Sequence, residues 1–138
     1  AFTSVNLNTA NATWTALAWD TSEGSTGFHS TAANSTQFSF PSTGVWVIGA
    51  NVPWSANGTG VRRSRLVLNG STTIFGSHLV APGAAVECAN MVVAQRRITS
   101  TADFVTVEAI QNSGSTLSVL ADSTTSGGAS FWAFRVSA

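Results

Sequence analysis

Residues 103–114 read DFVTVEAIQNSG, and this stretch decides the fold. Branched and aromatic side chains suit a pleated, half-buried strand, and the closing Asn-Ser-Gly is typical of a turn. Side chains alternate between the two faces of a strand, so Val105, Val107 and Ala109 share one face. We expect that face to meet the core of a β-sheet protein.

The other face of this strand is also partly apolar, because it carries Phe104 and Ile110. A strand in a two-sheet sandwich needs one apolar face for the core and can leave the other face polar. The extra apolar residues therefore indicate a second buried surface.

The closing run SFWAFRV shows the same feature more strongly. One face of such a strand takes Trp132, Phe134 and Val136, and the other carries Phe131 and Ala133. A second copy of the same chain is the simplest source of a surface that covers both strands, so we expect self-association. The residues predicted at the interface are Phe104, Ile110, Phe131 and Ala133.

Composition limits the class of protein. The chain has 138 residues and a mass of 14.2 kDa, which fits a single domain over residues 1–138. Six arginines, no lysine and six acidic residues give a net charge of zero. This balance argues against nucleic acid as a partner, and the lack of an 18-residue apolar run argues against membrane insertion. A single cysteine, Cys88, excludes an internal disulfide and is expected to pack as a small apolar residue.

Turn signals recur every eight to twelve residues, which favours an all-β sandwich or barrel of eight to ten strands. Asn69-Gly70 is the strongest hairpin signal. We expect the loops 20–34, 55–60 and 120–128 to face outward or contact a partner, and no uncleaved signal peptide is visible. The expected strands cover residues 2–7, 13–19, 37–40, 45–54, 61–68, 72–80, 84–95, 103–111, 117–121 and 130–136.

Four motifs in order resemble a known family. Residues 38–46, FSFPSTGVW, resemble the F-x-x-P-x-x-G-x-aromatic start of the long strand in the globular heads of the first complement component. Residues 65–70, RLVLNG, resemble the following strand and hairpin of that family. Residues 103–107 are similar to its G-D-x-V-x-L strand, with Ala102 in place of the usual glycine. Residues 130–134 match its closing S-x-F-x-G-F loosely.

This resemblance covers the chain from about Gln37 to the C-terminus. It implies a ten-stranded antiparallel jelly-roll sandwich of the tumour-necrosis-factor-like type, assembled as a homotrimer. The calcium-site residues of some animal members have no clear counterpart, so no metal and no cofactor are expected. The fold hosts many functions and does not by itself carry one.

A narrower resemblance points to a setting. The strand pattern D-F-V-x-V-x-A-x-Q-N-S-G followed by F-W-A-x-R is similar to small trimeric jelly-roll proteins of tailed-bacteriophage virions. It implies a structural virion protein without enzymatic activity, acting as a capsid decoration or as the receptor-binding tip of a tail fibre. Its partners would be itself and other virion proteins or a host-surface glycan. The alternative is an extracellular carbohydrate-binding module, secreted or on a cell surface.

The inventory of catalytic side chains is poor. His29 and His78 lie near no recognisable nucleophile motif, and the six carboxylates are scattered. Glu87 and Glu108 lie on strands that could pair, which leaves a glycosidase-type carboxylate pair open. We expect no enzyme and assign no catalytic residue.

Arginines form the one concentration of charge. One reading is a solvated edge or ion pairs across a subunit interface with Glu87, Asp103 or Glu108. The other reading is contact with an anionic partner such as a capsid surface or a charged glycan, gaining strength by avidity in a trimer. The candidate residues are Arg62, Arg63, Arg65, Arg96 and Arg97.

Five tryptophans are many for a chain of this length. Trp19 and Trp54 lie near expected loop edges, where an indole could stack on the face of a sugar. Packing in the core or at an interface is the alternative for both residues.

Overall fold

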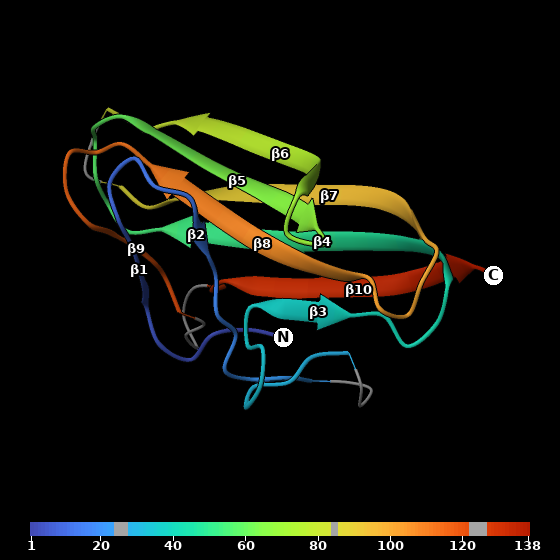
Figure 1. Ribbon diagram of the computed structural model, residues 1–138. Helices are drawn as coiled ribbons and strands as arrows, with labels where there is room; N and C mark the ends of the chain where they lie inside the picture. The colour runs from blue at the N-terminus through green and yellow to red at the C-terminus, as the bar shows by residue number, and fades with distance from the viewer. Residues whose placement is uncertain (24–27, 84–85, 122–126) are drawn as a thin grey trace.

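The computed structural model describes residues 1–23, 28–83, 86–121 and 127–138 (Figure 1). All regular structure in these residues is β-strand, and the strands form two five-stranded antiparallel sheets packed face to face. The strands are β1 (Leu7–Thr9), β2 (Thr15–Ala16), β3 (Gln37–Ser39), β4 (Gly44–Trp54), β5 (Val61–Leu68), β6 (Thr72–Val80), β7 (Cys88–Ile98), β8 (Phe104–Gln111), β9 (Leu117–Val119) and β10 (Ser130–Ser137).

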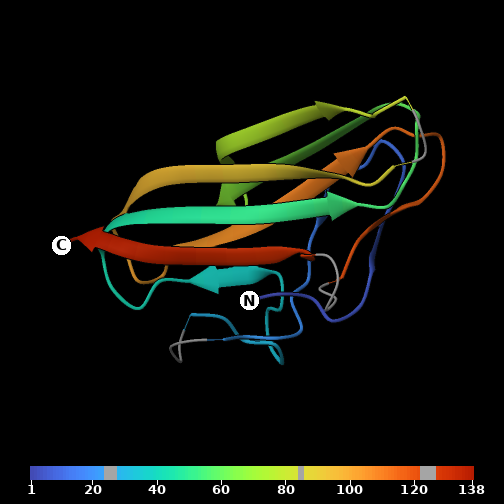
Figure 2. The same ribbon diagram turned by 180° about the vertical axis from the view of Figure 1, so that it is seen from behind.

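Sheet 1 is built around β4. Strand β7 pairs along the whole of β4, from Gly44 to Trp54, so β9 and β10 must share its other edge. Strand β1 pairs with β9 at one end of this edge. From behind, β7, β4 and β10 run side by side as one layer (Figure 2).

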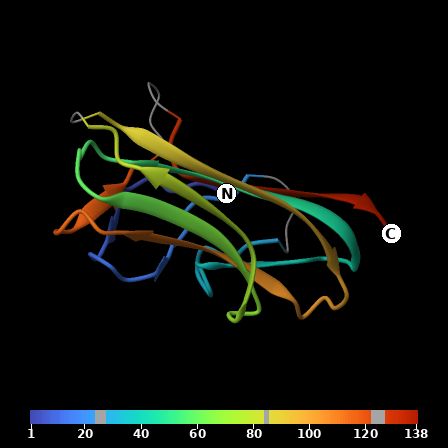
Figure 3. The same ribbon diagram turned by 90° about the horizontal axis from the view of Figure 1, so that it is seen from above.

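Sheet 2 is built around β8. Strand β5 pairs along one edge of β8, the short strands β2 and β3 share the other edge, and β6 lies outside β5. The edge strands β6 of sheet 2 and β7 of sheet 1 lie next to each other along one side of the sandwich (Figure 3). The all-β, two-sheet sandwich predicted from the sequence is confirmed, and its ten antiparallel strands are consistent with a jelly roll.

The core lies between the two sheets, and β8 presents to it the face that the sequence predicted. Val105, Val107 and Ala109 of β8 are fully buried there. Inward residues of β4 meet them from sheet 1; these are Trp46, Ile48, Ala50, Val52 and Trp54.

The faces of β10 are reversed relative to the prediction. Phe131 is only 2% exposed and packs in the core, with its ring stacked on Phe38. Trp132 and Phe134 point outward instead. The reason is the pairing with β4, because Phe131 lies directly opposite the inward-facing Ala50 and directly opposed residues share a face of the sheet.

The N-terminal strands are shorter than predicted. Phe2 makes only isolated bridges, and the expected strand over residues 13–19 is reduced to Thr15–Ala16. Leu17 and Trp19 are buried in the core, and beyond Ala16 the segment keeps single backbone hydrogen bonds, from the Leu17 N–H to the Val107 carbonyl oxygen and from the Trp19 N–H to the Ser35 carbonyl oxygen. The strand expected over residues 84–95 runs instead from Cys88 to Ile98, and residues 84–85 lie outside the described part.

The predicted hairpin over residues 61–80 is present, and Asn69 at its tip ties it to β8. Both Asn69 and Gly70 have positive φ, as a tight hairpin turn requires. The Asn69 side-chain Nδ2 donates to Asp103 Oδ1 over 2.9 Å, and its Oδ1 accepts from the Phe104 N–H over 2.9 Å. Asp103 Oδ2 also accepts from the N–H groups of Thr99 and Ser100. Two motifs distant in sequence therefore meet at this corner.

These hydrogen bonds make the stability depend on pH. The bond from Asn69 holds the pKa of Asp103 below its ordinary value of 3.8, helped by the N–H groups of Ser100 and Thr99 and opposed by partial burial. A lowered folded-state pKa stabilises the fold above the unfolded pKa, and the contribution is lost as the pH falls through the folded pKa.

We expect Asp103→Asn to lower the free energy of unfolding at pH 7 by about 0.5–1 kcal/mol, a modest effect because the carboxylate is close to solvent. Urea unfolding from pH 7 down to about pH 3 measures it, and the difference from wild type should shrink below pH 3.8. Glu87→Gln, at an exposed position, is the control. A difference that stays constant over this range would show that the charge of Asp103 is not the cause.

Candidate functional site

The outer face of sheet 1 carries exposed apolar side chains, and the polar Asn51 and Gln95 are also directed outward there. Met91 is 64% exposed, Phe134 53%, Val136 55% and Trp132 38%. We call this surface the apolar face; it comprises the outward residues Val45, Val47, Gly49, Met91, Val93, Trp132, Phe134 and Val136.

The registers of β7 and β10 on β4 make this face continuous. Gly49 lies opposite both Val93 and Trp132, so these residues form one row across three strands. The indole of Trp132 lies over Gly49, where any Cβ would collide with it. The rings of Trp132 and Phe134 stack with centroids 5.9 Å apart and planes 13° from parallel. The result is a flat aromatic surface on a rigid sheet.

Charge is nearly absent from the apolar face. The outward positions of β4, β7 and β10 include one charged side chain, Arg97, at the end of β7. Exposed apolar surfaces of this kind are candidate interaction sites.

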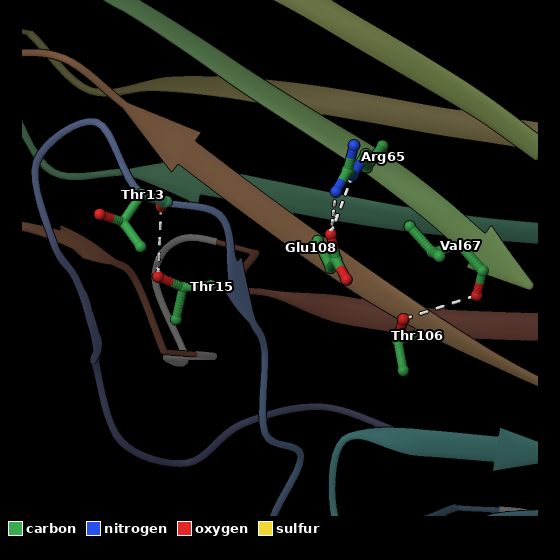
Figure 4. Close-up of polar contacts among 6 residues, drawn as sticks. All are labelled: Thr13, Thr15, Arg65, Val67, Thr106 and Glu108. Carbon is green, nitrogen blue, oxygen red and sulfur yellow. Dashed lines mark hydrogen bonds and ion pairs between the residues drawn. The ribbon is translucent and has the colours of Figure 1, made fainter. Parts of the chain in front are cut away.

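The outer face of sheet 2 has the opposite character. Arg65 of β5 donates from Nε to Glu108 Oε2 of β8 over 2.8 Å, and its second contact with the same oxygen is 2.7 Å (Figure 4). The Arg65 guanidinium also lies 4.0 Å from the ring centroid of Trp14. Arg63 and His78 are exposed on neighbouring strands of this sheet. The two faces of the sandwich are therefore clearly different.

The four residues predicted at the interface do not form one surface. Phe104 and Ile110 lie half-buried on β8, on the face opposite the core-facing valines, so they belong to sheet 2. Phe131 is buried in the core, and Ala133 shares its inward side. This corrects the predicted placement of Phe131 and Ala133, because the register with β4 turns both toward the interior.

Sequence reasoning missed Met91 and Val93. The signal was present, because residues 91–94 are apolar on both faces of their strand, as in the two strands that prompted the prediction of self-association. Val92 and Ala94 face the core side, and Met91 and Val93 face outward.

Arg62 is not available to a partner. It is fully buried, and its terminal nitrogens donate to the carbonyl oxygens of Asn57 (3.1 Å), Thr59 (2.8 Å) and Val61 (3.2 Å). Burial lowers the pKa of Arg62, and the nearby Cys88 partly opposes this. Arg62 therefore binds the 55–60 loop to the start of β5. This corrects the prediction that Arg62 contacts a partner at the surface.

The remaining arginines are divided between places. Arg63 and Arg65 lie on the outer face of sheet 2, whereas Arg96 and Arg97 are exposed near the end of β7 in sheet 1. The five arginines therefore do not act as one cluster.

Trp19 and Trp54 are fully buried, which corrects their expected position at the surface. Trp19 packs against Phe38 and Phe131. The Trp54 Nε1–H donates to Asn90 Oδ1 over 2.8 Å. Neither indole has a free face for a sugar.

The described residues contain no group of three or more His, Cys, Asp or Glu side chains placed to hold a metal ion. Glu87 lies just before β7 of sheet 1, and Glu108 lies on β8 of sheet 2. Strands β7 and β8 do not pair, so the two carboxylates are not brought together as neighbours in one sheet. Burial raises the pKa of the Cys88 thiol, and Arg62 only partly offsets this, which keeps the thiol protonated near neutral pH.

Comparisons of this chain with protein-family models and with curated proteins return no match. In the described residues, no helix is long and apolar enough to cross a membrane.

Proposed function

We propose that this chain is a non-enzymatic structural protein that assembles as a homotrimer through its apolar face and is carried on the virion of a tailed bacteriophage. The observation that supports assembly is the continuous apolar, charge-poor surface of β4, β7 and β10. The number of copies and the virion setting rest on the sequence resemblance described above.

A second copy of the same chain is the partner that the chemistry of this face favours. A surface with one arginine and no acidic residue offers almost no charge pattern for recognising a different protein. Apolar, charge-poor surfaces are typical of the interfaces between identical subunits in symmetric oligomers. Burying the outward rings of Trp132 and Phe134 removes from water the side chains that would cost most to leave exposed.

The proposed role is passive. With sheet 1 facing the threefold axis, sheet 2 and the loops point away from it and are free to grip a particle or meet a host surface. Of the loops predicted to do so, 55–60 is described throughout, and 20–34 and 120–128 lie partly outside the described residues. Capsid decoration and tail-fibre tip both fit this arrangement, as does an extracellular location in the alternative setting of a binding module.

Light scattering tests the assembly. We expect a native mass of about 43 kDa, three times the chain mass of 14.2 kDa. Phe134→Asp places a charge on the apolar face and should give monomers or aggregates at the same concentration. Phe75→Asp is the matched control, because Phe75 is similarly exposed but lies on β6 of sheet 2. A folded wild-type monomer, or equal dissociation by both variants, would contradict trimer formation through the apolar face.

Mass spectrometry tests the setting. In gradient-purified particles of the phage whose genome encodes this chain, peptides of the chain should be present in a stoichiometry divisible by three. The encoding gene should lie among genes for capsid, portal or tail proteins. Absence of the chain from intact particles would contradict the virion role and leave the trimer unaffected.

A further inference from the structure

A groove of about 470 Å³ lies on the outer face of sheet 2, where β5 and β6 run past Trp14. The groove is shallow and open to solvent, and its volume is large enough for a small molecule bound at the surface. Its lining contains basic, aromatic and hydroxyl groups and no carboxylate; the residues are Trp14, Arg63, Ser64, Arg65, Thr73, Gly76, Ser77 and His78.

Arg65 is held rigidly at one end of the groove. Glu108 binds its Nε and one terminal nitrogen (Figure 4). The Trp14 ring lies against the same guanidinium. The other terminal nitrogen has no hydrogen-bond partner within the described residues. A guanidinium fixed from two sides loses little freedom when a ligand binds, which is the preorganisation that a binding site needs.

Arg63 is the unbalanced charge of the groove. In the ranges that the structure describes, it forms no ion pair, and the one nearby carboxylate, Glu108, is engaged by Arg65. Arg63 lies directly opposite His78 in the β5–β6 register, so two basic side chains face each other across neighbouring strands. An anion bound here could accept hydrogen bonds from Arg63 and from the His78 ring.

Gly76 keeps the groove open. It lies opposite Arg65 on β6, and a Cβ there would meet only the Ser64 carbonyl oxygen at 3.5 Å and Arg65 Cβ at 3.8 Å. These are ordinary contacts, so packing does not require a glycine at this position. A larger side chain would point into the groove and fill it.

We infer that this groove binds an anionic saccharide, a uronic acid or a sugar phosphate. Arg63 supplies the fork-shaped donors that suit a carboxylate or phosphate, and the remaining terminal nitrogen of Arg65 adds one more donor. The indole edge and the Thr73 hydroxyl suit a sugar ring. The inference rests on the proposed function in one respect, since sheet 2 must face outward in the assembly. Three grooves per trimer would strengthen binding to a polymeric glycan by avidity.

Nuclear magnetic resonance titration tests this with the Trp14 indole N–H as the reporter. Sodium glucuronate and glucose 6-phosphate are the probes, and glucose and inorganic phosphate are the references. We expect saturable shifts of the Trp14 signal with a probe and weaker shifts with both references. Equal shifts with glucose would overturn the anion requirement. Equal shifts with inorganic phosphate would overturn the assignment to a saccharide.

Three variants locate the site. Arg63→Gln should weaken binding about tenfold, as the loss of a charge-assisted hydrogen bond predicts. Gly76→Val should abolish binding by filling the groove while keeping every charge, and a branched residue suits a strand. Arg96→Gln removes the same charge at an exposed position outside the groove and should leave binding unchanged. Wild-type affinity in both groove variants would overturn the proposal.

The native mass of each variant separates this inference from the proposed function. A trimer that binds no probe would contradict ligand binding in the groove and would leave the proposed assembly unaffected. A monomer that still binds glucuronate through Arg63 would contradict the proposed assembly and would leave the proposed binding site unaffected.

Discussion

The pairing of β10 with β4 is the constraint on which the rest of the molecule depends. Because Phe131 lies opposite Ala50, its ring enters the core and stacks on Phe38, and a buried aromatic side chain of this kind contributes about 1.5–3 kcal/mol. The same register turns Trp132 and Phe134 outward. A shift by one residue would exchange the two sets, leaving Phe131 in water and placing the rings of Trp132 and Phe134 inside. Burial in the core and exposure of the apolar face are thus two results of one alignment.

This alignment gives the sandwich two different sides. Sheet 1 presents aromatic and aliphatic side chains over β4, where Gly49 lets Trp132 lie flat. Sheet 2 presents an ion pair between Arg65 and Glu108 and the uncompensated Arg63. An apolar side suits contact between identical copies, and a charged side suits solvent and ligands. The proposed trimer and the proposed groove therefore use opposite faces and do not compete for surface.

What the sequence could predict depended on how local the determining interactions are. The hairpin formed by β5 and β6 was predicted with its bounds, because Asn69-Gly70 specifies the turn and neighbouring residues specify the strands. The core face of β8 was also predicted, because only one of its faces carries a continuous apolar row. The choice of face in β10 could not be predicted, since both faces are apolar and a strand distant in sequence decides between them.

The candidate site was harder to predict for a related reason. Apolar residues on both faces of a strand predicted that some apolar surface would remain outside the core. They did not predict where on the molecule this surface would lie. Arg62 resembled its exposed neighbour Arg63, and its burial depends on carbonyl groups of the 55–60 loop that no local pattern reveals. Trp54 was expected near a loop edge and is buried instead, with its N–H bonded to Asn90, a partner from another strand.

Oxidation of Met91 tests the central claim most directly, because it is the only methionine in the chain and lies on the apolar face. Within one chain its side chain is 64% exposed, and an exposed methionine is oxidised readily by hydrogen peroxide. If sheet 1 is buried between copies, Met91 of the native protein should be oxidised much more slowly than in the same chain unfolded in urea. Oxidation of the native protein at the unfolded rate would show that the apolar face is open to solvent, and would contradict the account.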